Sequence, residues 1–192
     1  MKAVFNFVLP LAALLTAAPA AGETFWTTRE LLGDPSFFGA SQRVTFRQFD
    51  LSPEQKARLE ARLGYRPPRD RYTIFVAQTG DRVDGYAVFD DEMGQHLPIS
   101  FAVKISPQGV VEGQEITAYR EPRGDEIRDP RFRRQFVGKS AHDALRPGED
   151  VAVVSGATIS SRAMSAGVKR ALVLVEELIL KPEPKGRPTA QR

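Results

Sequence analysis

Four side-chain hydroxyls fall within seven consecutive residues in the last quarter of the chain. The stretch is Ser155-Gly156-Ala157-Thr158-Ile159-Ser160-Ser161. Its small residues let another group approach the backbone closely. A long segment with helical periodicity follows, so we predict that the stretch lies at a helix start, where free N–H groups and the helix dipole favour an anion such as phosphate. The same composition suits an ordinary helix cap, and the residues alone leave both interpretations open.

Hydrophobic patterning predicts the elements that hold this stretch in place. The following helix is predicted over residues 161–180, from apolar residues at helical spacing. A helix at 53–63 has a capping box at Ser52 and a terminating Gly64, and shorter helices are predicted at 28–32 and 130–137. Residues 151–154 fit a brief strand or a buried loop. Strands are predicted at 44–49, 71–78, 83–90, 99–106 and 110–119, with an acidic turn at 90–94.

Short strands joined by tight turns predict an antiparallel meander. The predicted fold class is α+β: an antiparallel sheet packed with helices, with the long C-terminal helix after the hydroxyl-rich motif. The chain lacks the alternation of strands and helices and the Gly-rich turn of a Rossmann unit.

The motif and several upstream segments together resemble the FMN-binding domain family. That family includes the covalent-flavin subunits of Rnf complexes and of sodium-pumping NADH:quinone oxidoreductases. It also includes standalone exported FMN-binding proteins, which this chain looks most like. The resemblance covers about Val44 to Leu180. It rests on residues 155–160 and on the segments Gly85-Tyr86-Ala87-Val88, Gly94 to Ile99, Tyr119 to Ile127 and Phe132 to Lys139.

The resemblance implies a covalent cofactor. An ApbE-type flavin transferase would move FMN from FAD onto the Ser160 hydroxyl as a phosphoester, with Ser155, Gly156, Ala157 and Thr158 completing the cofactor-binding motif. It also implies that Glu121 and Gly124 lie near the flavin, although a charged turn is an equally good interpretation of them. His96 could donate to a ring carbonyl, but a surface position at a turn is the commoner case. The predicted function is an exported electron-transfer flavoprotein, a redox carrier more than a turnover enzyme.

The motif departs from the family pattern at one position. An aspartate usually stands three residues before the first serine, and here that residue is Ala152, with Asp150 as the nearest upstream acid. A local shift of the chain would let Asp150 take its place. The acceptor is also serine where threonine is commoner. Serine is chemically competent, so Ala152 is the feature that favours an alternative, a flavin-free exported binding or scaffold module of the same fold. A serine hydrolase is a weaker third hypothesis, because the chain has no G-x-S-x-G elbow.

The N-terminal residues predict where the protein is located. A basic start, an apolar run and the small residues 18–22 predict a signal peptide over 1–22, cleaved near Ala20 to Gly22, although a retained anchor is the alternative. The predicted domain then spans 23–180, with a disordered tail at 181–192, and the location is periplasmic with no membrane span after cleavage. The expected partners are a flavin transferase and membrane or periplasmic redox proteins.

Composition also excludes several other kinds of site. The chain has no cysteine, which excludes disulfides and cysteine-ligated clusters, and its two histidines are far apart, so no metal is expected. The net charge is only +3, with acidic residues among the clustered arginines, so no nucleic acid is expected.

Overall fold

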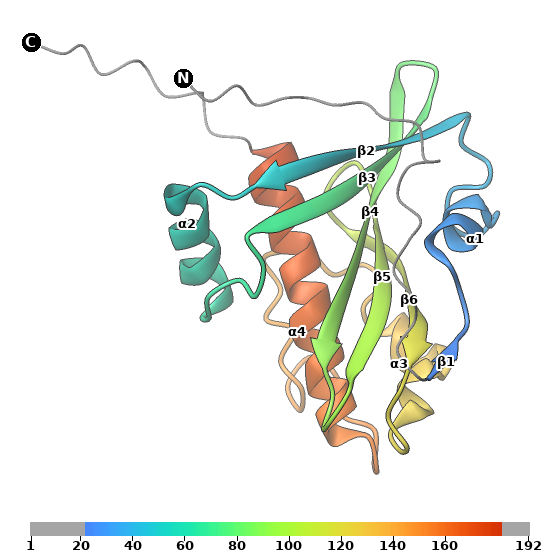
Figure 1. The fold of residues 1–192 in the computed structure, drawn as a ribbon, viewed down its shortest axis with the longest axis vertical. Helices are drawn as coiled ribbons and strands as arrows, with labels where there is room; N and C mark the ends of the chain where they lie inside the picture. Colours follow the sequence, from blue (N-terminus) through green and yellow to red (C-terminus); the bar gives the residue numbers. More distant parts are fainter. Residues whose placement is uncertain (1–21, 182–192) are drawn as a thin grey trace, which may run out of the picture.

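The computed structural model describes residues 22–181. The predicted signal peptide and tail lie outside these residues, except for Gly22 and Lys181. Within them, one six-stranded antiparallel sheet has the strand order β1-β6-β5-β4-β3-β2 (Figure 1). The strands are β1 (Glu23–Thr24), β2 (Arg43–Asp50), β3 (Arg71–Thr79), β4 (Arg82–Met93), β5 (Pro98–Ile105) and β6 (Val111–Tyr119). The predicted meander and the α+β fold class are therefore confirmed, and β1, which the sequence did not indicate, pairs with the end of β6.

Helices pack on both faces of this sheet. They are α1 (Thr28–Gly33), α2 (Pro53–Leu63), the 3-10 helix η2 (Asp125–Arg128), α3 (Pro130–Arg134), α4 (Thr158–Val175) and the π-helix η3 (Glu176–Leu180). The Ser52 hydroxyl accepts from Gln55 N–H at the start of α2, and Gly64 ends it at φ 79°. Both features are those that the sequence predicted. None of the helices within residues 22–181 has the length and apolar character that a membrane span requires.

Strand alternation divides the apolar side chains between two cores. Ile74, Val76, Val88 and Val103 face α4 in the larger core. Phe75, Ala77, Ala87 and Ala102 face the opposite way and pack with the buried leucines of α1. Figure 1 shows α4 and α1 on opposite sides of the central strands. The long helix therefore covers a largely apolar sheet face, and its first turn lies near the end of the sheet that carries the β4–β5 turn.

The predicted acidic turn at 90–94 is wrong, because β4 continues as strand to Met93. The cause is Arg170 of α4, which is 1% exposed. Its guanidinium donates to Asp90 Oδ2 at 2.7 Å, to Glu92 and, at 3.2 Å, to the Tyr65 hydroxyl. The two carboxylates on alternate strand residues thus face inward as partners of a buried cation. Apolar periodicity carries no signal for such a pair, since the partners are eighty residues apart.

The long helix also begins earlier than predicted, at Thr158 in place of Ser161. The last residues of the hydroxyl-rich motif therefore form the first helical turn. Ser161 allows this because its hydroxyl donates to Ala157 O at 2.8 Å, within the helix, and accepts from Val154 N–H at 3.3 Å. The predicted helix at 130–137 is shorter than expected and ends at Arg134.

Close packing between α4 and the sheet depends on Gly167. A Cβ atom there would contact the Phe101 ring, with Cε1 at 2.7 Å. We expect Gly167→Ala to lower the free energy of unfolding by about 1–3 kcal/mol through overpacking, measured by urea denaturation. Gly33→Ala is the matched control, because a Cβ at Gly33 meets nothing within 4 Å. Equal effects of the two substitutions would contradict this packing.

The Glu176 carboxylate forms ion pairs at the C-terminal end of α4. Burial acts to raise the pKa of Glu176, but hydrogen bonds and charges from Lys181 and Arg62 outweigh it and lower the pKa from 4.5 to about 2. His142 Nε2 also approaches Glu176, at 3.4 Å. A carboxyl whose folded pKa is lowered stabilises the fold fully above its unfolded pKa and loses that contribution as the pH falls through the folded value.

We therefore expect stability to fall between about pH 4.5 and pH 2 by an amount that depends on Glu176. Glu176→Gln should be less stable than wild type at pH 7 and should lose less stability than wild type across that interval. Urea midpoints measured at several pH values check this. Parallel pH profiles for the two proteins would contradict it.

Candidate functional site

The hydroxyl-rich motif lies on a loop and the first turn of α4. In the segment 151–154, which precedes the motif, Val151 alone forms a β-bridge, to Pro147. Residues 152–154 are therefore a loop and not a strand. Gly156 has φ 85°, a left-handed conformation that favours glycine. Within residues 22–181, no side chain caps the N-terminus of α4. The first-turn N–H groups are therefore left without helical partners, as an anion site requires.

The motif hydroxyls differ sharply in exposure. Ser155 and Thr158 are exposed, whereas Ser160 is only 5% exposed. The Ser160 Oγ lies 3.0 Å from the Tyr119 hydroxyl oxygen, at the end of β6. Tyr119 donates its own proton to Arg123 O at 2.6 Å. Since a phenol has a single proton, Ser160 must be the donor to Tyr119.

The environment of Tyr119 keeps its phenol neutral. Burial raises the pKa of Tyr119, the hydrogen bond with Ser160 acts in the opposite direction, and the charges of Glu121, Asp125 and Glu126 raise it further. Tyr119 is therefore a hydrogen-bond acceptor for Ser160 with no tendency to ionise near neutral pH. The Ser160 hydroxyl is thus oriented by a neutral group.

Gly124 packs directly over Ser160. Its φ of 90° is left-handed, and a Cβ there would lie 2.7 Å from the Ser160 Oγ and 2.8 Å from the Tyr119 hydroxyl. Any side chain at this position would be strained and would collide with both oxygens. The structure thus brings Gly124 together with Ser160, thirty-six residues away in the sequence.

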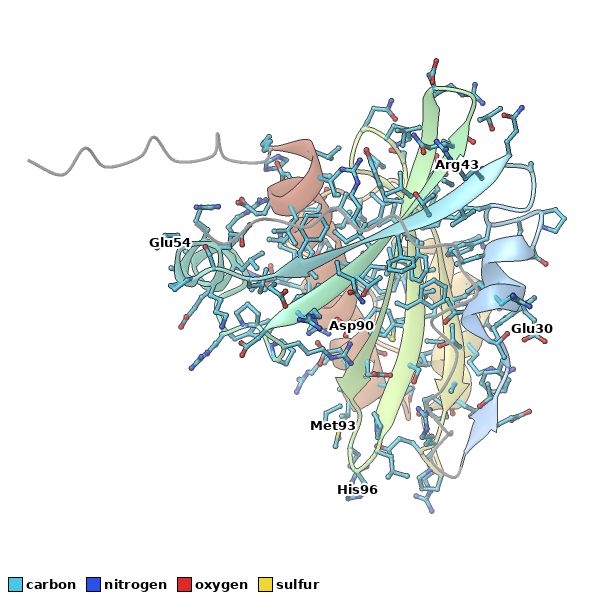
Figure 2. All side chains as sticks on the ribbon, turned by 45° about the horizontal axis from the view of Figure 1, so that its top comes forward. Glu30, Arg43, Glu54, Asp90, Met93 and His96 are labelled. Carbon is cyan, nitrogen blue, oxygen red and sulfur yellow. The ribbon has the colours of Figure 1, made fainter. Side chains whose placement is uncertain are left out.

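Glu121 makes its contacts with the β4–β5 turn. Its carboxylate accepts from the backbone N–H groups of His96 at 2.5 Å and Leu97 at 2.9 Å. Figure 2 labels Met93 and His96 at the tip of this hairpin, and His96 is exposed. Glu121 and His96 therefore meet through the backbone, as in the charged-turn interpretation. Their proposed roles beside a flavin stay predictions.

A cavity of about 430 Å³ adjoins the motif. Phe132, Val153 and Val154 supply its apolar wall, and Glu126 and Asp129 are among its charged residues. Glu126 also reaches the motif, with a carboxylate oxygen 3.6 Å from where a Cβ on Gly156 would lie. The cavity is within the usual size range of small-molecule sites.

Asp150 does not take the place of the aspartate that the family motif usually has at the position of Ala152. The Asp150 carboxylate accepts from the N–H groups of Leu145 and Arg146, at 3.0 and 2.6 Å, and pairs with Lys139. Ala152 is exposed, and both of its backbone polar groups bond to the Gln135 side chain. A local shift that presented Asp150 at the motif would break these contacts.

The sequence did not predict the contact of Tyr119 with Ser160. The only signal was its position at the start of the segment 119–127, which also contains Glu121 and Gly124. A spacing of forty-one residues between the two hydroxyls has no periodicity that would join them. The burial of Ser160 could not be predicted from the sequence either, because it depends on where residues 121–124 fold.

One family model matches part of the chain. Residues 94–173 match the family model of the FMN-binding domain. The chain is also similar to one subunit of the proton-translocating ferredoxin:NAD(+) oxidoreductase complex of Clostridium ljungdahlii. The two are 33% identical over 107 residues, which cover 51% of this chain and 57% of that protein.

Two solved structures are also similar. The first is NqrC of Shewanella oneidensis, with a TM-score of 0.42, 21% identity and coverage of 57% of each chain. The second is a subunit of the Na(+)-translocating NADH-quinone reductase of Parabacteroides distasonis, with a TM-score of 0.38, 21% identity and coverage of 53% of this chain and 63% of that one. The chain thus spans less than two thirds of each of these proteins.

Proposed function

Because residues 94–173 belong to the FMN-binding domain family, we propose that this protein is an exported electron carrier that holds FMN through a phosphoester bond to Ser160. The observation that carries the proposal is the position of the Ser160 hydroxyl. It lies in the uncapped first turn of α4, where it is oriented by a hydrogen bond to Tyr119 and covered by Gly124. The proposed attachment needs a hydroxyl beside backbone groups that favour an anion, and this turn supplies both.

The residues around Ser160 have the chemistry that a flavin phosphate and ring require. The N–H groups of Thr158 and Ile159 would donate hydrogen bonds to phosphate oxygens at the positive end of the helix dipole. Gly156 leaves the backbone of the turn open to close approach. The apolar wall of Phe132, Val153 and Val154 would exclude water from part of a planar ring. Bound FMN supplies one- or two-electron transfer, and the protein tethers and orients it.

Attachment is a substitution at phosphorus with FAD as the donor. A bond would form between the Ser160 Oγ and the phosphorus of the FMN half, the pyrophosphate P–O bond would break, and AMP would leave. The Ser160 proton must pass to a base. Tyr119 is not that base, because it is neutral and its own proton is bonded to a carbonyl oxygen. We therefore assign proton removal to the flavin transferase, which the proposal requires as a partner.

The setting and the redox partners are also part of the proposal. The sequence pattern at residues 1–22 supports export and a periplasmic location. The resemblance to an oxidoreductase-complex subunit supports electron exchange with membrane or periplasmic redox proteins. A carrier that stays outside the cytoplasm would benefit from a covalent link, since lost FMN is not replaced there.

Coexpression with an ApbE-type transferase in the bacterial periplasm, followed by intact-mass measurement and peptide mapping, tests the function. We expect a mass gain of one FMN residue, about 438 Da, located on Ser160. An unmodified mass beside a transferase that modifies another substrate in the same cells would overturn the proposal. The flavin-free binding module, which Ala152 and the buried Ser160 favour, would then be preferred.

A further inference from the structure

Residues 121–124, here called the cover loop, close over Ser160. The loop is fixed at one end by the Glu121 carboxylate on the β4–β5 turn, and η2 follows it with Ile127 fully buried. Between these points, Arg123 O accepts from Tyr119, and Gly124 is buried against the Ser160 side chain. The loop and Tyr119 leave Ser160 5% exposed.

This closed arrangement leaves no room for a phosphorus atom on Ser160. A single carbon added to Gly124 would already come within 2.7 Å of the Ser160 Oγ. A phosphate group is larger than a methyl group and must also meet the donor from outside the protein. The Ser160 hydroxyl is therefore blocked while Gly124 is in place.

The hydrogen bonds that Tyr119 makes while the cover loop is closed are equally incompatible with a phosphoester on Ser160. Ser160 donates its only proton to Tyr119, and Tyr119 donates its only proton to Arg123 O. An esterified Ser160 has no proton to donate. Tyr119 would then face a bare ester oxygen and could donate to it only by releasing Arg123 O.

We propose that the cover loop is a latch, held by Tyr119, which must open before flavin transfer to Ser160 and which cannot close in the same way afterwards. This inference rests on the proposed function, because it concerns access to the same acceptor. In the unmodified protein the closed loop satisfies the Ser160 hydroxyl and shields it. In the modified protein the loop lies elsewhere, because Tyr119 no longer receives a hydrogen bond from Ser160.

Tyr119→Phe tests the latch, because phenylalanine keeps the ring and removes both hydrogen bonds. Purified protein is incubated with FAD and an ApbE-type transferase, and intact mass is followed with time. We expect transfer to be faster than in wild type by about thirty-fold, the change in open population that follows from losing two net hydrogen bonds. Tyr86→Phe, at another buried tyrosine, is the matched control and should leave the rate unchanged.

Amide hydrogen exchange gives a second readout that needs no transferase. In Tyr119→Phe, peptides covering residues 121–128 should exchange faster than in wild type, while peptides from β3 and β4 should not change. Wild-type protein that carries flavin should show the same increase. An unchanged rate of exchange in this segment would overturn the latch.

The two proposals fail in different ways. If wild type is never modified by an active transferase, the proposed function fails and the exchange experiment still decides whether Tyr119 holds the loop. If wild type is modified on Ser160 but Tyr119→Phe reacts at the same rate or more slowly, the function stands and the latch is wrong.

Discussion

Ser160→Ala should remove all covalent flavin from protein coexpressed with the transferase. Alanine has no oxygen for the phosphoester and fits the buried helical position without strain, so the fold should persist. The cost is the hydrogen bond to Tyr119, about 1 kcal/mol. Intact mass and flavin fluorescence of the denatured protein measure the loss, and the expected change is from the wild-type level to none.

Ser155→Ala is the matched control for this experiment. Ser155 belongs to the same motif, but its hydroxyl is exposed and lies before the helix. We expect this variant to keep its flavin. Flavin that remains attached in Ser160→Ala, at Ser155 or Thr158, would show that the acceptor has been assigned to the wrong hydroxyl.

Arg170→Met should strongly destabilise the fold. Methionine fills much of the space but leaves Asp90, whose side chain is 1% exposed, without its main cation. Removing one partner of a buried ion pair typically lowers the free energy of unfolding by about 3–5 kcal/mol. Urea denaturation measures the effect. Arg162→Met is the matched control, since Arg162 is an exposed arginine of the same helix.

The double variant Asp90→Asn with Arg170→Met separates burial of charge from packing. Neutralising Asp90 removes the unpaired charge, so the double variant should be more stable than Arg170→Met alone. A double variant less stable than either single variant would contradict a charge-based cause. A loss below about 1 kcal/mol in Arg170→Met would show that Asp90 finds solvent or another cation, such as Arg69, which already contacts it at 2.8 Å.

Local sequence patterns predicted the elements whose causes are local. The capping box at Ser52 and the alternation along β3 and β5 depend on residues within a few positions of one another, and the structure confirms them. The elements that were missed depend on distant partners. β4 runs through an acidic segment because of Arg170, and α4 starts early because Ser161 binds the loop before it.

The candidate site shows the same division. The motif and its place beside a helix start were predictable from Ser155 to Ser160. The structure also places Gly124 beside Ser160, and its position near a flavin stays a prediction. Tyr119 was not readable, because its hydroxyl meets Ser160 only when β6 and α4 pack together. The burial of Ser160 beneath Gly124 could not be predicted either, because it depends on the left-handed turn at Gly124.

The meander topology also sets an order of folding. β2 to β6 are consecutive in both sequence and space, so their pairings close short loops and can form early. The contacts of α4 with the sheet join residues as much as eighty positions apart and carry a larger loop-closure cost. We therefore expect the docking of α4 to be a late event. Until it docks, Ser160 has neither Tyr119 beside it nor Gly124 above it, so a folding chain passes through a stage in which the Ser160 hydroxyl is open to solvent.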